Sequence, residues 1–154
     1  MSITYNLKPL AEMIDISEKD EIVRIATASG RIRLKVDTVK RIKNNQVKKG
    51  DVFTIAKIAA INSVKKVPDL IPLCHSIPIN NIALEFKIEN ETIIKVSCRV
   101  KSISKTGVEM EALTGVGVAL LNIWDVVKMY EKDEEGQYPS TLIYDIRVEE
   151  KIKN

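Results

Sequence analysis

The longest helical pattern in the chain constrains its fold more than any other feature. The stretch TGVEMEALTGVGVALLNIWDVVKMYEKD, residues 106–133, predicts a helix that begins near Val108 and runs for about 25 residues. Its apolar positions recur every three or four residues, which is typical of a helix with one buried face. We expect that face to consist of Met110, Leu113, Gly117, Leu120, Trp124 and Val127.

Alternating apolar and polar residues predict strands on both sides of this helix. Residues 21–34 are rich in β-branched side chains and predict a strand, with Gly30 as a possible bend. Residues 81–90 and 91–103 alternate strictly and predict a β-hairpin that turns near Asn90. A final strand is expected from about Leu142.

Two further helices are expected between the first strand and the hairpin. Residues 35–45 predict a short helix with Asp37 as its cap. Residues 48–69 predict a stronger helix that Gly50 and Asp51 open and Pro68 ends.

The resulting order is βαββαβ, the split arrangement of ferredoxin-like domains. We therefore expect one domain over residues 1–154, an α+β fold with an antiparallel sheet and its helices packed on one face. Residues 1–20 are polar with short apolar patches and predict a loosely docked arm. The opposite face of the sheet would still need cover, which favours an oligomer.

Composition excludes several classes of protein. The chain is 45% hydrophobic and 29% charged, with a net charge of +3, which is too weak to indicate nucleic acid by itself. Apolar runs stay short of the ~20 residues that span a bilayer, and the first residues do not resemble a secretory signal, so we expect a cytoplasmic protein. One histidine and two cysteines cannot fill a four-coordinate zinc site, so no metal site is predicted.

The only histidine lies in a stiff apolar segment, DLIPLCHSIPI, residues 69–79. Pro72 and Pro78 fix the backbone around it, which suits the wall of a pocket. In an extended segment Cys74 and His75 would point to opposite sides. His75 then either binds a phosphate or carries a proton, or it is simply packed; Cys74 lacks an evident activating base.

Acidic and basic residues on the long helix also have two interpretations. Glu109 and Glu111 suit the positive end of the helix dipole, and Asp125 and Lys128 have the spacing of a surface ion pair. Alternatively, both groups belong to a functional site. Glu111 and Asp125 would lie ~21 Å apart along a helix, so one small substrate in one subunit could not easily reach both. That distance favours sites at a subunit boundary.

The densest basic stretch, residues 40–50, holds five Lys or Arg residues and no acid. It is interpreted either as a solvated helix face and turn or as an anion site.

Several of these segments together resemble one known family. MIDIS (residues 13–17), KKGDV (48–52), the Cys-His segment, KTGVEMEALTGVGVALLNIWDVVK (105–128) and DIRVEEK (145–151) are similar to the cyclic pyranopterin monophosphate synthase family, the MoaC proteins. The order and spacing match through most of the chain. The pairing of the Cys-His segment with the Thr-Gly-Val-Glu-Met-Glu-Ala-Leu helix is highly specific.

The resemblance implies the second step of molybdenum cofactor biosynthesis. In that step 3′,8-cyclo-7,8-dihydroguanosine 5′-triphosphate becomes cyclic pyranopterin monophosphate and diphosphate. The resemblance implies a ferredoxin-like homohexamer, a trimer of dimers, with active sites at subunit interfaces. It implies a small nucleotide substrate and no redox cofactor. The weak net charge and the short apolar runs noted above predict no nucleic acid or membrane partner.

The resemblance also implies roles for particular residues. Asp125 matches the catalytic aspartate and Lys128 its partner lysine, which would move protons during ring opening and closure. The implied substrate contacts, including basic positions suited to a triphosphate, are Leu73, Cys74, His75, Met110, Glu111, Glu109, Lys49, Arg24 and Lys151.

Two departures from the family pattern concern the end of the chain. A Gly-Gly-Lys-Ser-Gly tail common in bacterial members is replaced by EEKIKN, and residues 131–145 make a longer connection than usual. Both affect the match of Lys151, and neither affects Asp125 or Lys128.

Overall fold

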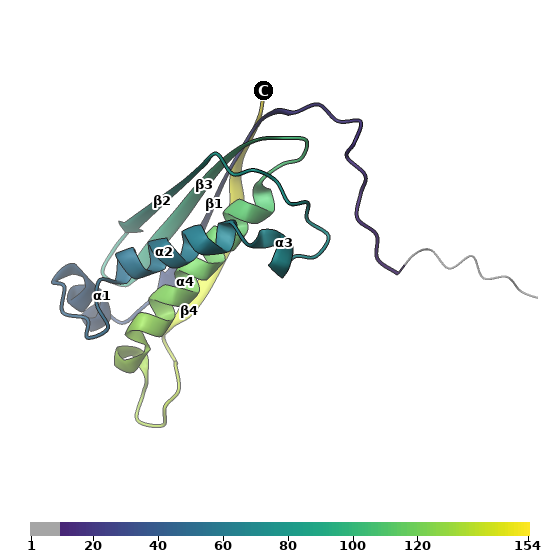
Figure 1. Ribbon diagram of the computed structural model, residues 1–154. Coiled ribbons are helices and arrows are strands. Elements are labelled where there is room, and N and C mark those ends of the chain that lie inside the picture. Colours follow the sequence, from purple (N-terminus) through teal and green to yellow (C-terminus); the bar gives the residue numbers. More distant parts are fainter. Residues whose placement is uncertain (1–9) are drawn as a thin grey trace, which may run out of the picture.

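One antiparallel sheet organises the molecule, as the sequence predicts. The computed structural model describes residues 10–154, and within them four strands pair in the order β2-β3-β1-β4. Figure 1 shows α2 and α4 packed together across one face of this sheet. The elements are β1 (Ile22–Arg33), α1 (Val36–Lys43), α2 (Val52–Val64), α3 (Val67–Leu70), β2 (Asn81–Ile88), β3 (Ile93–Ser104), α4 (Glu109–Glu131) and β4 (Leu142–Lys153).

This order and topology confirm the α+β, ferredoxin-like fold. Every neighbouring pair of strands is antiparallel, because each pair of sequential strands is either a hairpin or joined by helices that cross over an intervening strand. The predicted hairpin is present, with Asn90 accepting hydrogen bonds from the backbone N–H groups of Thr92 and Ile93, both at 2.9 Å. Gly30 does not break β1, but the pairing of β1 with β4 shifts twice, between Thr27 and Ala28 and between Ser29 and Arg31, and the second shift spans Gly30.

The buried face of α4 is offset from the predicted stripe. Leu120 and Val127 are fully buried as predicted, but Leu113, Gly117 and Trp124 are only partly buried and Met110 is 39% exposed, so the prediction was wrong for most of the stripe. Small residues instead bring the helix close to the sheet and α2. The buried positions are Glu111, Ala112, Gly115, Val116, Ala119, Leu120, Ile123, Val126, Val127 and Glu131.

The limits of the middle helices differ in two respects from the prediction. Asp51 caps α2 by accepting a hydrogen bond from the Thr54 N–H at 2.8 Å, as expected. Asp37 does not cap α1; Lys35 occupies the cap position and Asp37 lies in the first turn. Pro68 does not end α2, which stops at Val64; it begins the short α3, where its missing N–H is tolerated.

The uncovered face of the sheet carries several ion pairs beside apolar side chains, of which Ile103 is 46% exposed. Arg31 forms ion pairs with Glu89 at 2.9 Å and with Asp145, and Arg99 pairs with Glu150 at 3.1 Å. These ion pairs suit contact with water, but Ile103 is an exposed apolar side chain on the same face, so cover by an oligomer stays a prediction. Phe86 of the hairpin points to the side covered by helices and stacks on Phe53 with ring centroids 5.0 Å apart.

By length and composition alone, α4 could cross a membrane, since its mean hydropathy over 18 residues is 1.4. Half of that window is buried inside the protein. Among the residues described, α4 is therefore best understood as the central helix of the core.

Candidate functional site

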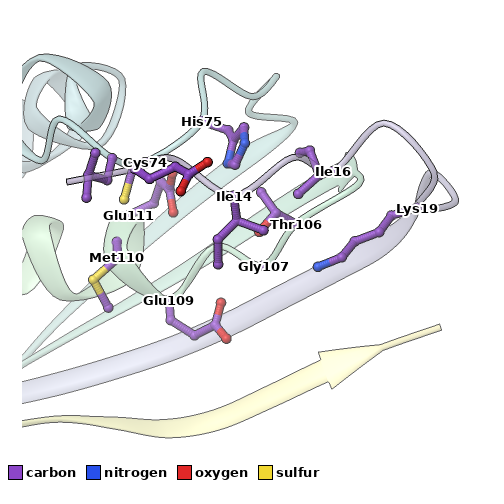
Figure 2. A pocket seen from close by; sticks show the side chains of 12 residues that line it. Ile14, Ile16, Lys19, Cys74, His75, Thr106, Gly107, Glu109, Met110 and Glu111 are labelled. Carbon is purple, nitrogen blue, oxygen red and sulfur yellow. The ribbon is translucent and has the colours of Figure 1, made fainter. Parts of the chain in front are cut away.

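A cavity of about 420 Å³ lies at the start of α4. Figure 2 shows side chains from three separate parts of the chain around it: the N-terminal arm, the Cys-His segment, and the β3–α4 connection with the first turn of α4. The lining residues are Glu12, Ile14, Ile16, Lys19, Leu73, Cys74, His75, Thr106, Gly107, Glu109, Met110 and Glu111.

Six of the predicted substrate contacts thus come together. Cys74 and His75 line the same cavity, so the prediction that they point to opposite sides was wrong. The reason is local: the segment turns at residues 71–74, where the Cys74 N–H donates to the Ile71 carbonyl at 3.0 Å, and is not extended. Burial and the nearby Glu111 raise the pKa of the Cys74 thiol, which keeps it protonated and argues against a nucleophilic role.

Two carboxyl groups beside the cavity have opposite electrostatic surroundings. Glu111 is only 4% exposed, and burial, with the charge of Glu109, raises its pKa. Burial would also raise the pKa of Glu109, but its hydrogen bond to Lys151 and the charges of Lys151 and Arg24 lower it overall. Glu109 lies against Gly107, where a Cβ atom would collide with its carboxylate. Near neutral pH Glu111 therefore holds a proton more readily than Glu109.

Arg24 and Lys151 lie next to this pair, outside the lining of the cavity. Lys151 of β4 forms an ion pair with Glu109. Arg24 is 8% exposed and donates to the carbonyls of Ser104 at 3.4 Å and Lys105 at 3.2 Å. Its guanidinium supports the β3–α4 connection, whereas Lys151 is exposed enough to exchange partners.

The other predicted residues form a second cluster toward the end of α4. Lys128 Nζ lies 2.8 Å from Asp125 Oδ1, and Lys49 Nζ lies 3.2 Å from Asp125 Oδ2 and 2.8 Å from the Asp125 carbonyl oxygen. The hydrogen bond from Lys128 lowers the pKa of Asp125 most, and the hydrogen bond from Lys49 lowers it further. The bond between Asp125 and Lys128 also raises the pKa of Lys128. Asp125 is 58% exposed at its side chain, so this cluster faces solvent.

The structure does not bring the two clusters together within one chain. Both are on α4, where Glu111 and Asp125 are separated by 14 positions, ~21 Å at 1.5 Å per residue. The basic stretch at residues 40–50 contributes only Lys49 to a cluster.

Sequence reasoning missed the arm as part of the cavity. Residues 10–20 contain no helix or strand, yet Lys105 Nζ donates to the Ser17 carbonyl at 2.7 Å and ties the arm to the start of α4. The rest of the predicted arm, residues 1–9, lies outside the described residues. The available signal was the alternation of Ile14 and Ile16 in a polar segment.

Among residues 10–154, no three His, Cys, Asp or Glu side chains lie close enough together to hold an ion.

Comparison with known proteins identifies the family. Residues 13–154 match the model of the MoaC family, so the chain belongs to this family. A protein of Archaeoglobus fulgidus is 54% identical over 153 residues, covering 99% of this chain and 97% of the relative. Proteins of Saccharolobus solfataricus (93% and 95% covered) and Thermococcus kodakarensis (92% and 90%) are also 54% identical. Each of the three bears the name "Probable cyclic pyranopterin monophosphate synthase".

Proposed function

We propose that this chain is a cyclic pyranopterin monophosphate synthase of molybdenum cofactor biosynthesis, working in the cytoplasm. It converts 3′,8-cyclo-7,8-dihydroguanosine 5′-triphosphate to cyclic pyranopterin monophosphate and releases diphosphate. The observation that carries the proposal is the convergence of the Cys-His segment and the first turn of α4 on one cavity. The three relatives named above support the same reaction.

Asp125 and Lys128 carry the proton transfers in this proposal. The two ammonium groups keep Asp125 ionised, so its carboxylate can serve as a proton acceptor, although its lowered pKa makes it a weaker base than a free aspartate. Lys128 stays protonated and supplies positive charge to the leaving group, although its raised pKa makes it a weaker proton donor than a free lysine. Lys49 and Lys151 are exposed cations suited to the phosphate groups, with Leu73, His75 and Met110 shaping the pocket.

The separation of the clusters leads us to propose shared active sites. If the cavity of one subunit faces the Asp125 cluster of a second subunit, one substrate reaches both. A homohexamer built as a trimer of dimers would meet this requirement.

Turnover of the cyclic nucleotide triphosphate tests the reaction. Purified protein should produce cyclic pyranopterin monophosphate and diphosphate, and Asp125→Asn should lower kcat by about 10²- to 10⁴-fold, the usual contribution of acid–base catalysis. Glu134→Gln, an exposed acid in the loop after α4, is the matched control and should behave as wild type. Folded wild-type protein without turnover would refute the proposal.

Mixing two inactive variants tests the shared site. Asp125→Asn and Glu111→Gln damage different clusters, so random mixed dimers should recover up to about a quarter of wild-type activity, because half the dimers are mixed and each has one intact site. Recovery no greater than the two variants show separately would place each site within one subunit.

A further inference from the structure

The connection between α1 and α2 places Lys49 beside Asp125, and Tyr130 of α4 holds this connection in position. The N–H of Lys48 donates to Tyr130 Oη at 2.9 Å, and the ammonium of the next residue, Lys49, reaches both the carboxylate and the carbonyl of Asp125. Asp125 and Tyr130 are five positions apart on the same helix. The hydrogen bond therefore fixes the start of the Lys49 side chain relative to the group it serves.

The connection itself is a tight loop. The N–H of Gln46 donates to the Arg41 carbonyl at 2.8 Å, and the N–H of Gly50 donates to the Val47 carbonyl at 3.1 Å. The N–H of Lys48 instead donates outside the loop, to Tyr130 of α4. Gly50 has a φ of 121°, which favours glycine, and Asn45 has a φ of 53°. The hydrogen bond from the Lys48 N–H therefore joins the loop to α4 immediately before Lys49.

A second contact orders the anchor. The Arg41 guanidinium of α1 lies over the Tyr130 ring, 4.7 Å from its centroid. This contact fixes the plane of the ring and so the direction of its hydroxyl. Tyr130 is thus linked both to the helix before the loop and to the loop backbone.

We propose that Tyr130 is a positioning residue for the reaction, acting through Lys49. Its hydroxyl accepts the Lys48 N–H and thereby keeps the Lys49 ammonium on Asp125, which lowers the entropy lost when an exposed lysine is brought into place. The proposal rests on the proposed role of the Asp125 cluster. The charged and titratable groups around Asp125 are Lys128 on α4, Lys49 on the loop, and Tyr138 of the α4–β4 connection, which acts on Lys128.

The test removes the hydroxyl and keeps the ring. Tyr130→Phe retains the Arg41 contact and should lower kcat by about 3- to 10-fold, the size expected for one hydrogen bond. Because Lys49 would then occupy its place on Asp125 less often, the acidic limb of the kcat pH profile should move to higher pH. Tyr144→Phe, on the charged face of the sheet, is the matched control and should change neither quantity.

A double variant separates positioning from a general structural effect. In a Lys49→Ala background, Tyr130→Phe should cause no further loss of kcat, because the residue through which it acts is gone. A further loss of several-fold in the double variant would overturn the proposal, and so would wild-type kcat and pH profile in Tyr130→Phe.

A measurement without turnover distinguishes this inference from the proposed function. The Asp125 carboxyl can be titrated by ¹³C NMR in wild type, Tyr130→Phe and Lys49→Ala. Its pKa should rise in both variants, even if the wild type proves inactive on the chosen substrate. A rise in Lys49→Ala alone would show that Tyr130 does not hold the lysine.

Discussion

Replacement of the buried Glu131 should strongly destabilise the fold. Glu131, at the last turn of α4, is fully buried and its carboxylate accepts three hydrogen bonds. The donors are the Lys35 N–H at 2.9 Å and the hydroxyls of Thr38 and Thr141, both at 2.5 Å. One carboxylate thus joins α4 to the start of α1 and to the residue before β4.

The magnitude follows from those three donors. Glu131→Ala leaves two nearly buried hydroxyls and a partly buried N–H without their acceptor, at about 1–3 kcal/mol for each buried group. Rotation of the hydroxyls and entry of water offset part of that cost, so we expect a loss of about 3–5 kcal/mol, a large value for one substitution that the breaking of a buried hydrogen-bond network can produce. The total free energy of unfolding of a typical domain is only about 5–15 kcal/mol.

Urea unfolding at one fixed protomer concentration measures this loss, since any oligomer would make stability depend on concentration. Glu131→Gln keeps one acceptor oxygen and the side-chain volume, so its loss should be smaller, about 1–2 kcal/mol. Glu134→Ala, which is exposed, should stay within about 0.5 kcal/mol of wild type. A loss below about 1 kcal/mol for Glu131→Ala, with an unchanged m-value, would refute the reasoning.

Two further predictions concern the packing and titration of α4. A Cβ at Gly115 would lie 2.7 Å from Cys98 Sγ and 3.0 Å from a methyl of Val64, so Gly115→Ala should lower the free energy of unfolding by about 1–2 kcal/mol in thermal unfolding, although alanine has the better helix propensity. Gly117 has nothing within 4 Å of such a Cβ, so Gly117→Ala should be neutral or more stable by up to about 1 kcal/mol. Equal stability of the two variants would contradict the clash at Gly115. The raised pKa of Glu111 means that its contribution to stability is full below its ordinary value of 4.5 and is lost as pH rises through the folded-state value. Glu111→Gln should therefore gain stability relative to wild type between pH 4 and pH 7, and a constant difference in Tm across that range would show that Glu111 titrates normally.

Strong periodicity explains why most elements could be predicted from the sequence. The alternation in residues 81–103 and the helical spacing after Val108 identified the hairpin and α4 to within a few residues. The offset of the buried face was missed because Ala112, Gly115 and Ala119 are too small to stand out as apolar positions. Small side chains set how closely α4 can approach the sheet and α2, and that distance depends on the surface against which the helix packs.

The ion pair of Asp125 and Lys128 is another local feature, since side chains three positions apart on a helix are neighbours. Lys49 could not be added to that pair from the residues alone, because 76 positions separate it from Asp125. The resemblance to the MoaC family named Lys49 as a substrate contact, but its partner became visible only in the fold.

The sequence by itself determined the order of the elements, the ferredoxin-like topology and the spacing of two acidic groups along one helix. These depend on interactions between residues close in sequence, which a periodic pattern records. Tertiary structure alone decided that the arm closes one side of the cavity, that Cys74 and His75 share it, that ion pairs form across the open face of the sheet, and that Tyr130 anchors the loop carrying Lys49. Each of these depends on contacts between segments far apart in the chain, whose geometry is fixed only once α4 packs on the sheet.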